Sequence, residues 1–292
     1  MKNTMIAALV VLFLSVSNAA FARASGTEPE HAPITISSGL DVSRATVTVS
    51  INGQSYACVL DTGTSTMLVS RAVAYSAGLS AEEPVDEISP DGLRYADQRT
   101  HLGHFLVAGY AMRDVPALIS SKLPGTTVLC GYDFFARIPT IIDRDRQTVT
   151  LFAAPAALDT MHCLSVDLTP RVPVGTLEIN GAWVDRIVLD SGMVGGGVIW
   201  SGVADRLPPP STTSYQPDPA DLQRAMHCGY NATIGLFDGS PRSFVPICTS
   251  SQRPDGYNGI IEMNLPTVHR LAIDYPNRRV CFSTGLPMTA LR

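Results

Sequence analysis

The sequence contains one pattern twice, and this repeat constrains the fold more than any other feature. Residues 50–63, SINGQSYACVLDTG, have a counterpart in residues 178–192, EINGAWVDRIVLDSG. Each copy places an Asn-Gly pair between two β-rich runs, which is typical of a type I′ hairpin turn because both residues tolerate positive φ. Each second run ends in Val-Leu-Asp, followed by a hydroxyl residue and a glycine. The sequence therefore predicts two hairpins that each end in an aspartate.

The ends of the two halves repeat as well. Residues 141–152, IIDRDRQTVTLF, match residues 272–283, AIDYPNRRVCFS, in which an apolar-Asp turn precedes an alternating strand. The hairpin aspartates lie 129 residues apart and the closing aspartates 131 residues apart, so the offset is nearly constant along the half. Such an offset indicates a duplicated chain. We expect an N-terminal lobe at 34–152, a linker at 153–163 and a C-terminal lobe at 164–292.

The first residues and the overall charge indicate where the chain acts. Residues 1–22 combine Lys2, an apolar run and an Ala20-Phe21-Ala22 cleavage pattern, which predicts a secretory signal followed by a disordered leader at 23–33. The net charge of −5 and the lack of a basic run argue against nucleic-acid binding. No other long apolar run occurs, so we expect an exported protein, periplasmic or extracellular, that does not span a membrane.

Two motifs in matched hairpins carry a resemblance to a known family. Asp61-Thr62-Gly63-Thr64 and Asp190-Ser191-Gly192 resemble the active-site loops of aspartic proteases. Each half is similar to a retropepsin-like unit, with an apolar segment before its closing aspartate at 128–135 and 259–265. The two units in tandem resemble the pepsin-type arrangement in one chain. The resemblance implies an all-β, bilobed acid-protease fold with two pseudo-twofold-related, β-barrel-like lobes and short helices.

The resemblance also implies a catalytic pair. Asp61 and Asp190 would meet between the lobes and activate water, because two carboxylates that share one proton can act as base and acid together. The implied activity is that of an exported aspartic endopeptidase without a metal or cofactor, acting as a monomer on a peptide or protein substrate. In this family the neighbouring hydroxyls and glycines hold the pair, which assigns supporting roles to Thr62, Gly63, Thr64, Ser191 and Gly192.

Three features depart from the family pattern. Met193 stands where a small or hydroxyl residue is usual. The offset aligns Glu262 with the turn glycine Gly131, so the sequence does not predict the backbone conformation at this place in the second half. No flap tyrosine is evident, and Tyr95 and Tyr230 are only candidates. A catalytically weak or inactive peptide-binding protein that retains the acid-protease cleft is therefore the alternative function.

All six cysteines lie in the part of the chain expected to be exported, where an even number favours disulfides. Six cysteines allow about 15 connectivities. The retropepsin-like fold suggests a bond between the strand before Asp61 and the apolar segment beside it. A hairpin and the outer strands of the second lobe suggest two others. The expected pairs are Cys58–Cys130, Cys228–Cys248 and Cys163–Cys281. The histidines are scattered, so we expect no zinc site.

Overall fold

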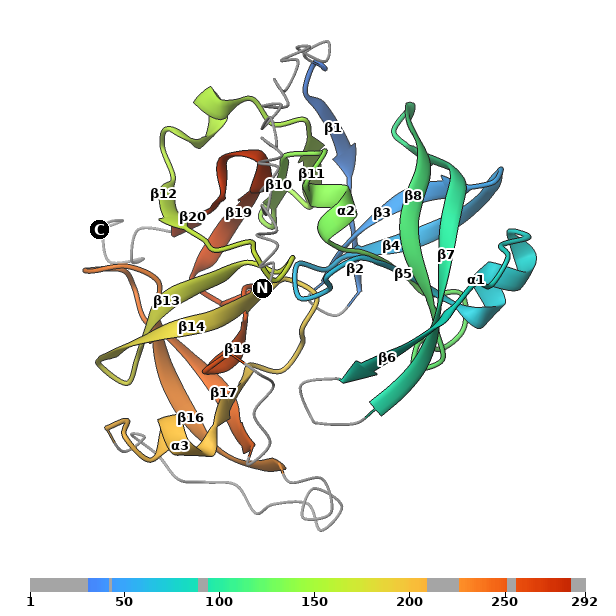
Figure 1. Ribbon diagram of the computed structural model, residues 1–292. Helices are drawn as coiled ribbons and strands as arrows, with labels where there is room; N and C mark the ends of the chain where they lie inside the picture. The colour runs from blue at the N-terminus through green and yellow to red at the C-terminus, as the bar shows by residue number, and fades with distance from the viewer. Residues whose placement is uncertain (1–30, 42–43, 89–93, 209–225, 251–255, 285–292) are drawn as a thin grey trace, which may run out of the picture. The chain divides into compact units, whose positions relative to one another are not determined.

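Strands make up most of both halves of the chain in the computed structural model (Figure 1). The structure describes residues 31–41, 44–88, 94–208, 226–250 and 256–284. The expected signal sequence, residues 1–22, and nearly all of the expected leader lie outside this part. Residues 32–292 form one unit that contains both halves. None of the described helices is long and apolar enough to cross a membrane.

The first half forms an eight-stranded sheet with the order β2-β3-β4-β9-β5-β8-β7-β6. A further pairing of β3 with β7 closes the strands between them into a ring. The elements are β2 Gly39–Asp41, β3 Arg44–Ile51, β4 Gln54–Leu60, β5 Met67–Ser70, α1 Arg71–Ser76, β6 Pro84–Ile88, β7 Arg94–Val107, β8 Tyr110–Ser120, β9 Val128–Cys130 and α2 Tyr132–Phe135.

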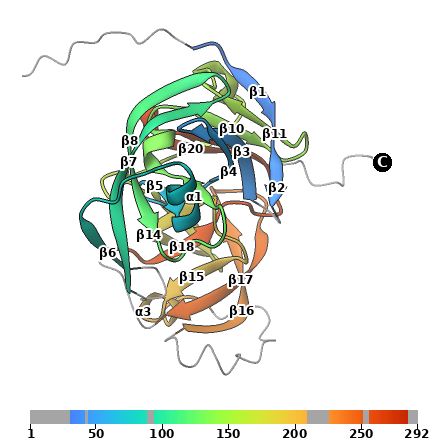
Figure 2. The same ribbon diagram turned by 90° about the vertical axis from the view of Figure 1, so that its right-hand side faces the viewer.

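The second half repeats this order in a closed barrel, β13-β14-β18-β15-β17-β16. In Figure 2, β15, β17 and β16 lie side by side, as their pairing requires. The barrel strands correspond in order to β3, β4, β9, β5, β8 and β7, which confirms the expected fold class. The elements are β13 Val174–Ile179, β14 Ala182–Asp190, β15 Gly197–Trp200, α3 Ser201–Ala204, β16 Met226–Gly235, β17 Ser243–Ser250 and β18 Gly259–Glu262.

A third, six-stranded sheet is shared by both halves in the order β1-β11-β10-β19-β20-β12. The halves join where β10 pairs with β19, with Ile142 opposite Leu271. The segment expected as a linker, 153–163, holds a 3-10 turn and the start of β12, which pairs with β20. The elements are β1 Ile34–Ser37, β10 Thr140–Asp143, β11 Thr148–Leu151, η1 Pro155–Leu158, β12 His162–Ser165, β19 Val268–Asp274, η3 Tyr275–Asn277 and β20 Arg279–Thr284.

The Asn-Gly pairs form the hairpin turns that the sequence predicts. Asn52 and Gly53 have φ of 49° and 86°, and Asn180 and Gly181 have φ of 51° and 85°. Positive φ at both central residues is the signature of a type I′ turn, whose twist matches that of the flanking strands. These turns fix the register of β3 with β4 and of β13 with β14. The register in turn determines where the aspartate at the end of each second strand lies.

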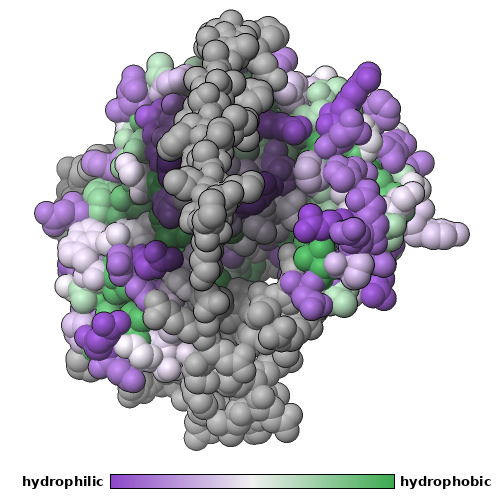
Figure 3. Space-filling model, in the orientation of Figure 1, coloured by the Kyte–Doolittle hydropathy of each residue, from purple (hydrophilic) through white to green (hydrophobic). Residues whose placement is uncertain are grey.

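Apolar side chains fill the interior of both halves, and a single buried cluster contains Leu60, Leu189 and Leu271. On the face shown in Figure 3, polar and charged residues cover most of the described surface, with smaller apolar patches between them. The strands that carry the aspartates are thus anchored in the core, which holds their ends in fixed positions.

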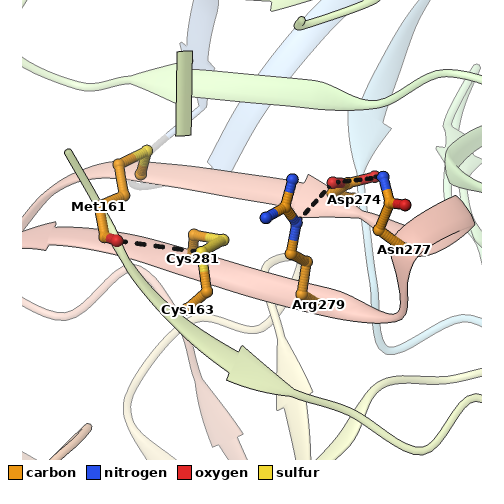
Figure 4. The surroundings of a disulfide bond; sticks show 6 residues. All are labelled: Met161, Cys163, Asp274, Asn277, Arg279 and Cys281. Atoms are coloured by element: carbon orange, nitrogen blue, oxygen red, sulfur yellow. Dashed lines mark hydrogen bonds and ion pairs between the residues drawn. A yellow bond between two sulfur atoms is a disulfide. The ribbon is translucent and has the colours of Figure 1, made fainter. Parts of the chain in front are cut away.

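Disulfides tie strands together in both halves. Cys58–Cys130 joins β4 to β9, and Cys163–Cys281 joins β12 to β20 (Figure 4). Both are pairs that the sequence analysis expected. Cys248 is also disulfide-bonded, and the register places it opposite Cys228, whose side chain lies outside the described part. Cys58–Cys130 closes a loop that contains Asp61, and it therefore stabilises the fold by reducing the conformational freedom of the unfolded chain.

Candidate active site

Asp61 and Asp190 lie at corresponding places in the two halves. Asp61 directly follows β4, and its backbone N–H donates to the carbonyl oxygen of Cys130 in β9 at 3.0 Å. Asp190 is the last residue of β14, in parallel register with Glu262 of β18. Each aspartate therefore ends a buried apolar strand that is held by a parallel neighbour.

Two buried hydroxyls connect the loops that follow the aspartates. The Thr62 hydroxyl donates to the carbonyl of Leu189 at 2.6 Å and accepts the N–H of Ser191 at 2.9 Å. The Ser191 hydroxyl donates to the carbonyl of Leu60 at 2.8 Å and accepts the N–H of Thr62 at 3.1 Å. Each hydroxyl thus both donates and accepts a hydrogen bond. The four resulting bonds connect the two halves next to the carboxyl groups.

The two carboxyl groups themselves meet. Asp61 and Asp190 share a side-chain hydrogen bond. Gly63 donates its N–H to Oδ1 of Asp61 at 3.0 Å, and Gly192 donates to Oδ1 of Asp190 at 2.7 Å. A Cβ on Gly63 would lie 2.2 Å from Oδ2 of Asp190, and one on Gly192 would lie 2.2 Å from Cγ of Asp61. Only glycine fits at either position.

The residue three positions after each aspartate makes the pair unequal. The Thr64 hydroxyl hydrogen-bonds to Asp61. Its counterpart Met193 has no hydroxyl, but its backbone N–H donates to Oδ1 of Asp190 at 2.9 Å. The Met193 side chain instead packs on an apolar cluster that includes Val188. The departure at Met193 thus removes a hydroxyl contact and leaves a backbone donor.

Electrostatics distinguish the two carboxyls in the same way. The pKa of Asp190 lies well above its usual range because burial and the adjacent negative charge of Asp61 both disfavour its ionisation. Burial also raises the pKa of Asp61, but the Thr64 hydroxyl, the bond from Asp190, the Gly63 N–H and the charge of Lys122 oppose this effect. The pKa of Asp190 is thus raised more strongly than that of Asp61, and the two carboxyls titrate as a pair rather than independently.

Glu262 fits the second half because the loop after Asp190 differs from its counterpart. Oε2 of Glu262 accepts the N–H groups of Gly195 at 3.0 Å and Gly196 at 2.8 Å. The φ values of these glycines are 99° and 106°, which other residues rarely adopt. In the first half, a Cβ on Gly131 would lie 2.1 Å from the carbonyl oxygen of Thr66. The sequence did not predict the backbone conformation at this place in the second half. The structure shows that the Glu262 carboxylate holds the loop that contains Gly195 and Gly196.

An arginine from the second half holds the loop that follows Asp61. Nε of Arg171 donates to the carbonyl of Ser65 at 2.8 Å, and its guanidinium pairs with Asp133 at 2.6 Å. Asp133 also accepts the hydroxyl of Thr66 at 2.8 Å, and Arg171 stacks over the ring of Tyr132. Sequence reasoning missed Arg171, since its contacts lie 106 and 38 residues away and no local pattern marks them.

Lys122 and Tyr275 are two further groups near the pair that the sequence did not single out. Lys122 is the only lysine besides Lys2, and its charge lowers the pKa of Asp61. Tyr275 is 3% exposed, and its pKa is raised well above its usual range by burial and by the charges of the two aspartates. Both residues therefore lie within electrostatic reach of the carboxyls.

The flap candidates are not tested by the structure. Tyr95 lies in β7, paired with Glu87 of β6, but its side chain and the tip of this hairpin, residues 89–93, lie outside the described part. Tyr230 lies in β16 opposite Ile247, and its side chain is likewise not described. Both residues stay predictions. Across the described residues, no group of three or more His, Cys, Asp or Glu side chains is arranged to hold a metal ion.

Comparisons with known proteins agree with this architecture. The profile of the family described as "gag-polyprotein putative aspartyl protease" matches residues 47–137, which include Asp61. The crystal structure of the aspartic proteinase from Irpex lacteus matches with a TM-score of 0.54 and 12% identity, over 89% of this chain and 99% of that one. None of the curated protein sequences matches the chain.

The fold match and the profile match together define the class of the chain. The fold match spans both halves, and at this identity it shows the bilobed aspartic-proteinase fold. The profile match adds a likeness to that aspartyl-protease family over residues 47–137 of the first half. The resemblance to the retropepsin-like and pepsin-like aspartic proteases, predicted from the two Asp-hydroxyl-Gly motifs, is confirmed.

Proposed function

We propose that this chain is an exported aspartic endopeptidase in which Asp61 and Asp190 activate water. The observation that carries the proposal is the hydrogen bond between these two carboxyls, each presented by an equivalent loop of one half. Hydrolysis by a peptidase of this class is also in keeping with the family profile and the fold. No covalent enzyme intermediate is needed, because the pair can both remove and supply protons.

In the proposed reaction, Asp61 is the base and Asp190 is the acid. The Asp61 carboxylate takes a proton from water as its oxygen attacks the scissile carbonyl carbon, while Asp190 gives its proton to the carbonyl oxygen. The resulting tetrahedral diol breaks at the C–N bond as Asp61 gives its proton to the leaving nitrogen and Asp190 takes a proton from a diol hydroxyl. The products are a carboxylic acid and an amine, and the pair again holds one proton.

Substrate would lie extended beside the pair. A cavity of about 630 Å³ in the first half borders Asp61 and is large enough for a side chain. Strand β6 stands at the end of the eight-stranded order, so its outer edge is suited to pair with an extended peptide. One chain supplies both aspartates, so we propose that the monomer is active.

Export is proposed from the predicted signal at 1–22 together with the disulfides. Disulfides persist in oxidising compartments such as the periplasm or the extracellular space. Cys58–Cys130 joins the aspartate-bearing strand β4 to β9, and Cys163–Cys281 joins two strands of the shared sheet. Fusion of residues 1–30 to a periplasmic reporter should export the reporter. Retention of the reporter in the cytoplasm would contradict this part of the proposal.

The enzymatic proposal is tested with a peptide library and three proteins: wild type, Asp61→Asn and Asp190→Asn. Wild type should cleave internal peptide bonds at acidic to mildly acidic pH, and both variants should lose at least about a hundredfold, since each lacks half of a general acid–base pair. A statine-type mimic of the tetrahedral diol should inhibit wild type. Equal cleavage by all three proteins would refute the assignment of the pair.

The alternative is a peptide-binding protein with little activity, and Met193 is the observation that favours it. Its side chain cannot give Asp190 the hydroxyl contact that Thr64 gives Asp61. If this contact is essential, wild type should bind library peptides but cleave none of them. Replacement of Met193 by Thr should then raise cleavage. Active wild type would remove this alternative.

A further inference from the structure

The two sides of the carboxyl pair differ in the residues that β3 and β13 supply. The hairpin turns align Asn52 with Asn180, and this register aligns Arg44 with Val172 and Thr46 with Val174. Arg44 and Thr46 line the cavity that borders Asp61. Val172 and Val174 belong instead to an apolar cluster in the second half. The first-half side of the site is thus polar and cationic where the second-half side is apolar.

The walls of the cavity beside Asp61 suit an elongated side chain with a polar end. Ala57 and Val59 of β4, with Leu129 of β9, form an apolar floor. Residues 123–127 also line the cavity and include Thr126 and Thr127, of which the Thr127 hydroxyl donates to the carbonyl of Pro124 at 2.6 Å. Apolar walls with a few polar groups at one end are typical of pockets that select one kind of side chain.

Two of the residues that line this cavity carry a charge. Arg44 is the cationic residue among those that line it, and Asp61 is the acidic one. Lys122 directly precedes residues 123–127, and its positive charge reaches Asp61. Against a net charge of −5 for the chain, two cations beside one cavity are a local exception.

We propose that this cavity selects an acidic substrate side chain close to the scissile bond, and that Arg44 binds its carboxylate. This inference rests on the proposed peptidase function and specifies its substrate class. Arginine is suited to the role because its planar guanidinium can donate two parallel hydrogen bonds to a carboxylate. Lys122 adds an attraction at longer range. The apolar cluster with Val172 and Val174 would contact an apolar residue on the other side of the scissile bond.

The test compares peptides that are identical except for Glu or Gln at one position, scanned from four residues before to four residues after the cleaved bond. At one position wild type should cleave the Glu peptide with a kcat/KM about tenfold higher, which corresponds to about 1.4 kcal/mol. Arg44→Met should bring this ratio close to one, and Arg44→Glu should favour a Lys peptide instead. Lys122→Met should lower the ratio by less than Arg44→Met does.

Arg71→Met is the matched control, because Arg71 is an exposed residue at the start of α1 outside the cavity. It should keep the wild-type Glu/Gln ratio. The same ratio should be measured as binding to Asp190→Asn, because Asp190 is not among the residues that line the cavity and this variant tests binding there without catalysis. Equal use of Glu and Gln at every position by an active wild type would overturn this inference and leave the peptidase proposal standing. A protein that binds Glu peptides selectively but cleaves none would support the cavity and contradict the peptidase proposal.

Discussion

The loops that follow Asp61 and Asp190 reach the same geometry by different contacts. In the first half, Gly131 leaves room for the carbonyls of Thr64 and Thr66, and the backbone N–H of Tyr132 donates to Thr64 at 3.0 Å. In the second half, the side chain of Glu262 occupies the position of Gly131 and accepts two backbone N–H groups of the loop. One loop is held through its carbonyls and the other through its amides.

This difference shows how a duplicated site can diverge without losing its centre. The contacts of Thr62 and Ser191, which connect the halves, are reciprocal. The outer contacts are not, since Arg171 from the second half holds the Asp61 loop, whereas Arg144 from the first half donates to the carbonyls of Asn264 and Leu265. We infer that symmetry is required where the carboxyls meet and is relaxed one contact further out.

The largest expected effect is at the symmetric centre. Gly63→Ala and Gly192→Ala each place a Cβ 2.2 Å from the opposite carboxyl group, so both should abolish measurable cleavage and destabilise the fold by about 1–3 kcal/mol or more. Gly202→Ala is the control, because a Cβ there meets nothing within 4 Å. Peptide cleavage and urea unfolding measure the two effects. If only one of the two alanine variants lost activity, the centre would not be symmetric.

Glu262 is next in expected effect. Glu262→Ala leaves the N–H groups of Gly195 and Gly196 without this acceptor, which should cost about 1–3 kcal/mol of unfolding free energy for the buried Gly196 amide and less for the exposed Gly195 amide. Glu262→Gln keeps one carbonyl acceptor and should lose less than half as much. Urea unfolding of the two variants gives the comparison. Equal losses would mean that charge, rather than hydrogen bonding, holds this loop.

Arg171 tests the asymmetric outer contacts. Arg171→Met removes the bonds to Ser65 and Asp133 and should cost about 1–3 kcal/mol, with a fall in kcat larger than the change in KM. Arg171→Lys should restore little, because an ammonium cannot make both bonds and stack on Tyr132 in the same way. The control is Arg206→Met, because the Arg206 guanidinium donates to the carbonyl of Gly202, four residues before it in the chain. An unchanged kcat in Arg171→Met would show that the Asp61 loop does not need this arginine.

Lys122 should have the smallest effect, visible in the pH profile. Since its charge lowers the pKa of Asp61, Lys122→Met should raise that pKa and move the acidic limb of kcat/KM to higher pH, by less than about one unit because this charge is the weakest of the four effects that lower the pKa. The alkaline limb, which follows loss of the Asp190 proton, should move little. A shift of both limbs together, or of the alkaline limb alone, would contradict the assignment of Asp61 as the base.

The centre of the site could be predicted from the sequence because its determinants are local. The Asn-Gly turns fix the hairpin register, and Asp61 and Asp190 lie at the ends of the second hairpin strands. The local motif is therefore enough to predict where each aspartate lies in its half. Two of the expected disulfides also follow from strand neighbours. The repeat offset identified Glu262 as an unusual residue at the position of a turn glycine. It did not predict that Glu262 accepts backbone N–H groups from two glycines, because these glycines lie 66 and 67 residues away.

The outer parts of the site depend on contacts that no local pattern encodes. Lys122 and Tyr275 are close to the carboxyl pair in space but not in the chain, and Arg171 bonds to residues that lie 106 and 38 positions away. The polar character of Arg44 stands out only when the two hairpins are aligned by their turns, because Val172 then takes the equivalent position. Residues whose side chains lie outside the described part, such as Tyr95 and Tyr230, stay predictions.

The most direct test of the account is a double-mutant cycle on the carboxyl pair, with kcat/KM measured for Asp61→Asn, Asp190→Asn and the double variant. Residues that act as one unit are strongly non-additive, so each single variant should lose as much activity as the double variant. Losses that add independently, or a single variant that keeps wild-type cleavage, would contradict the claim that one shared proton links the two halves.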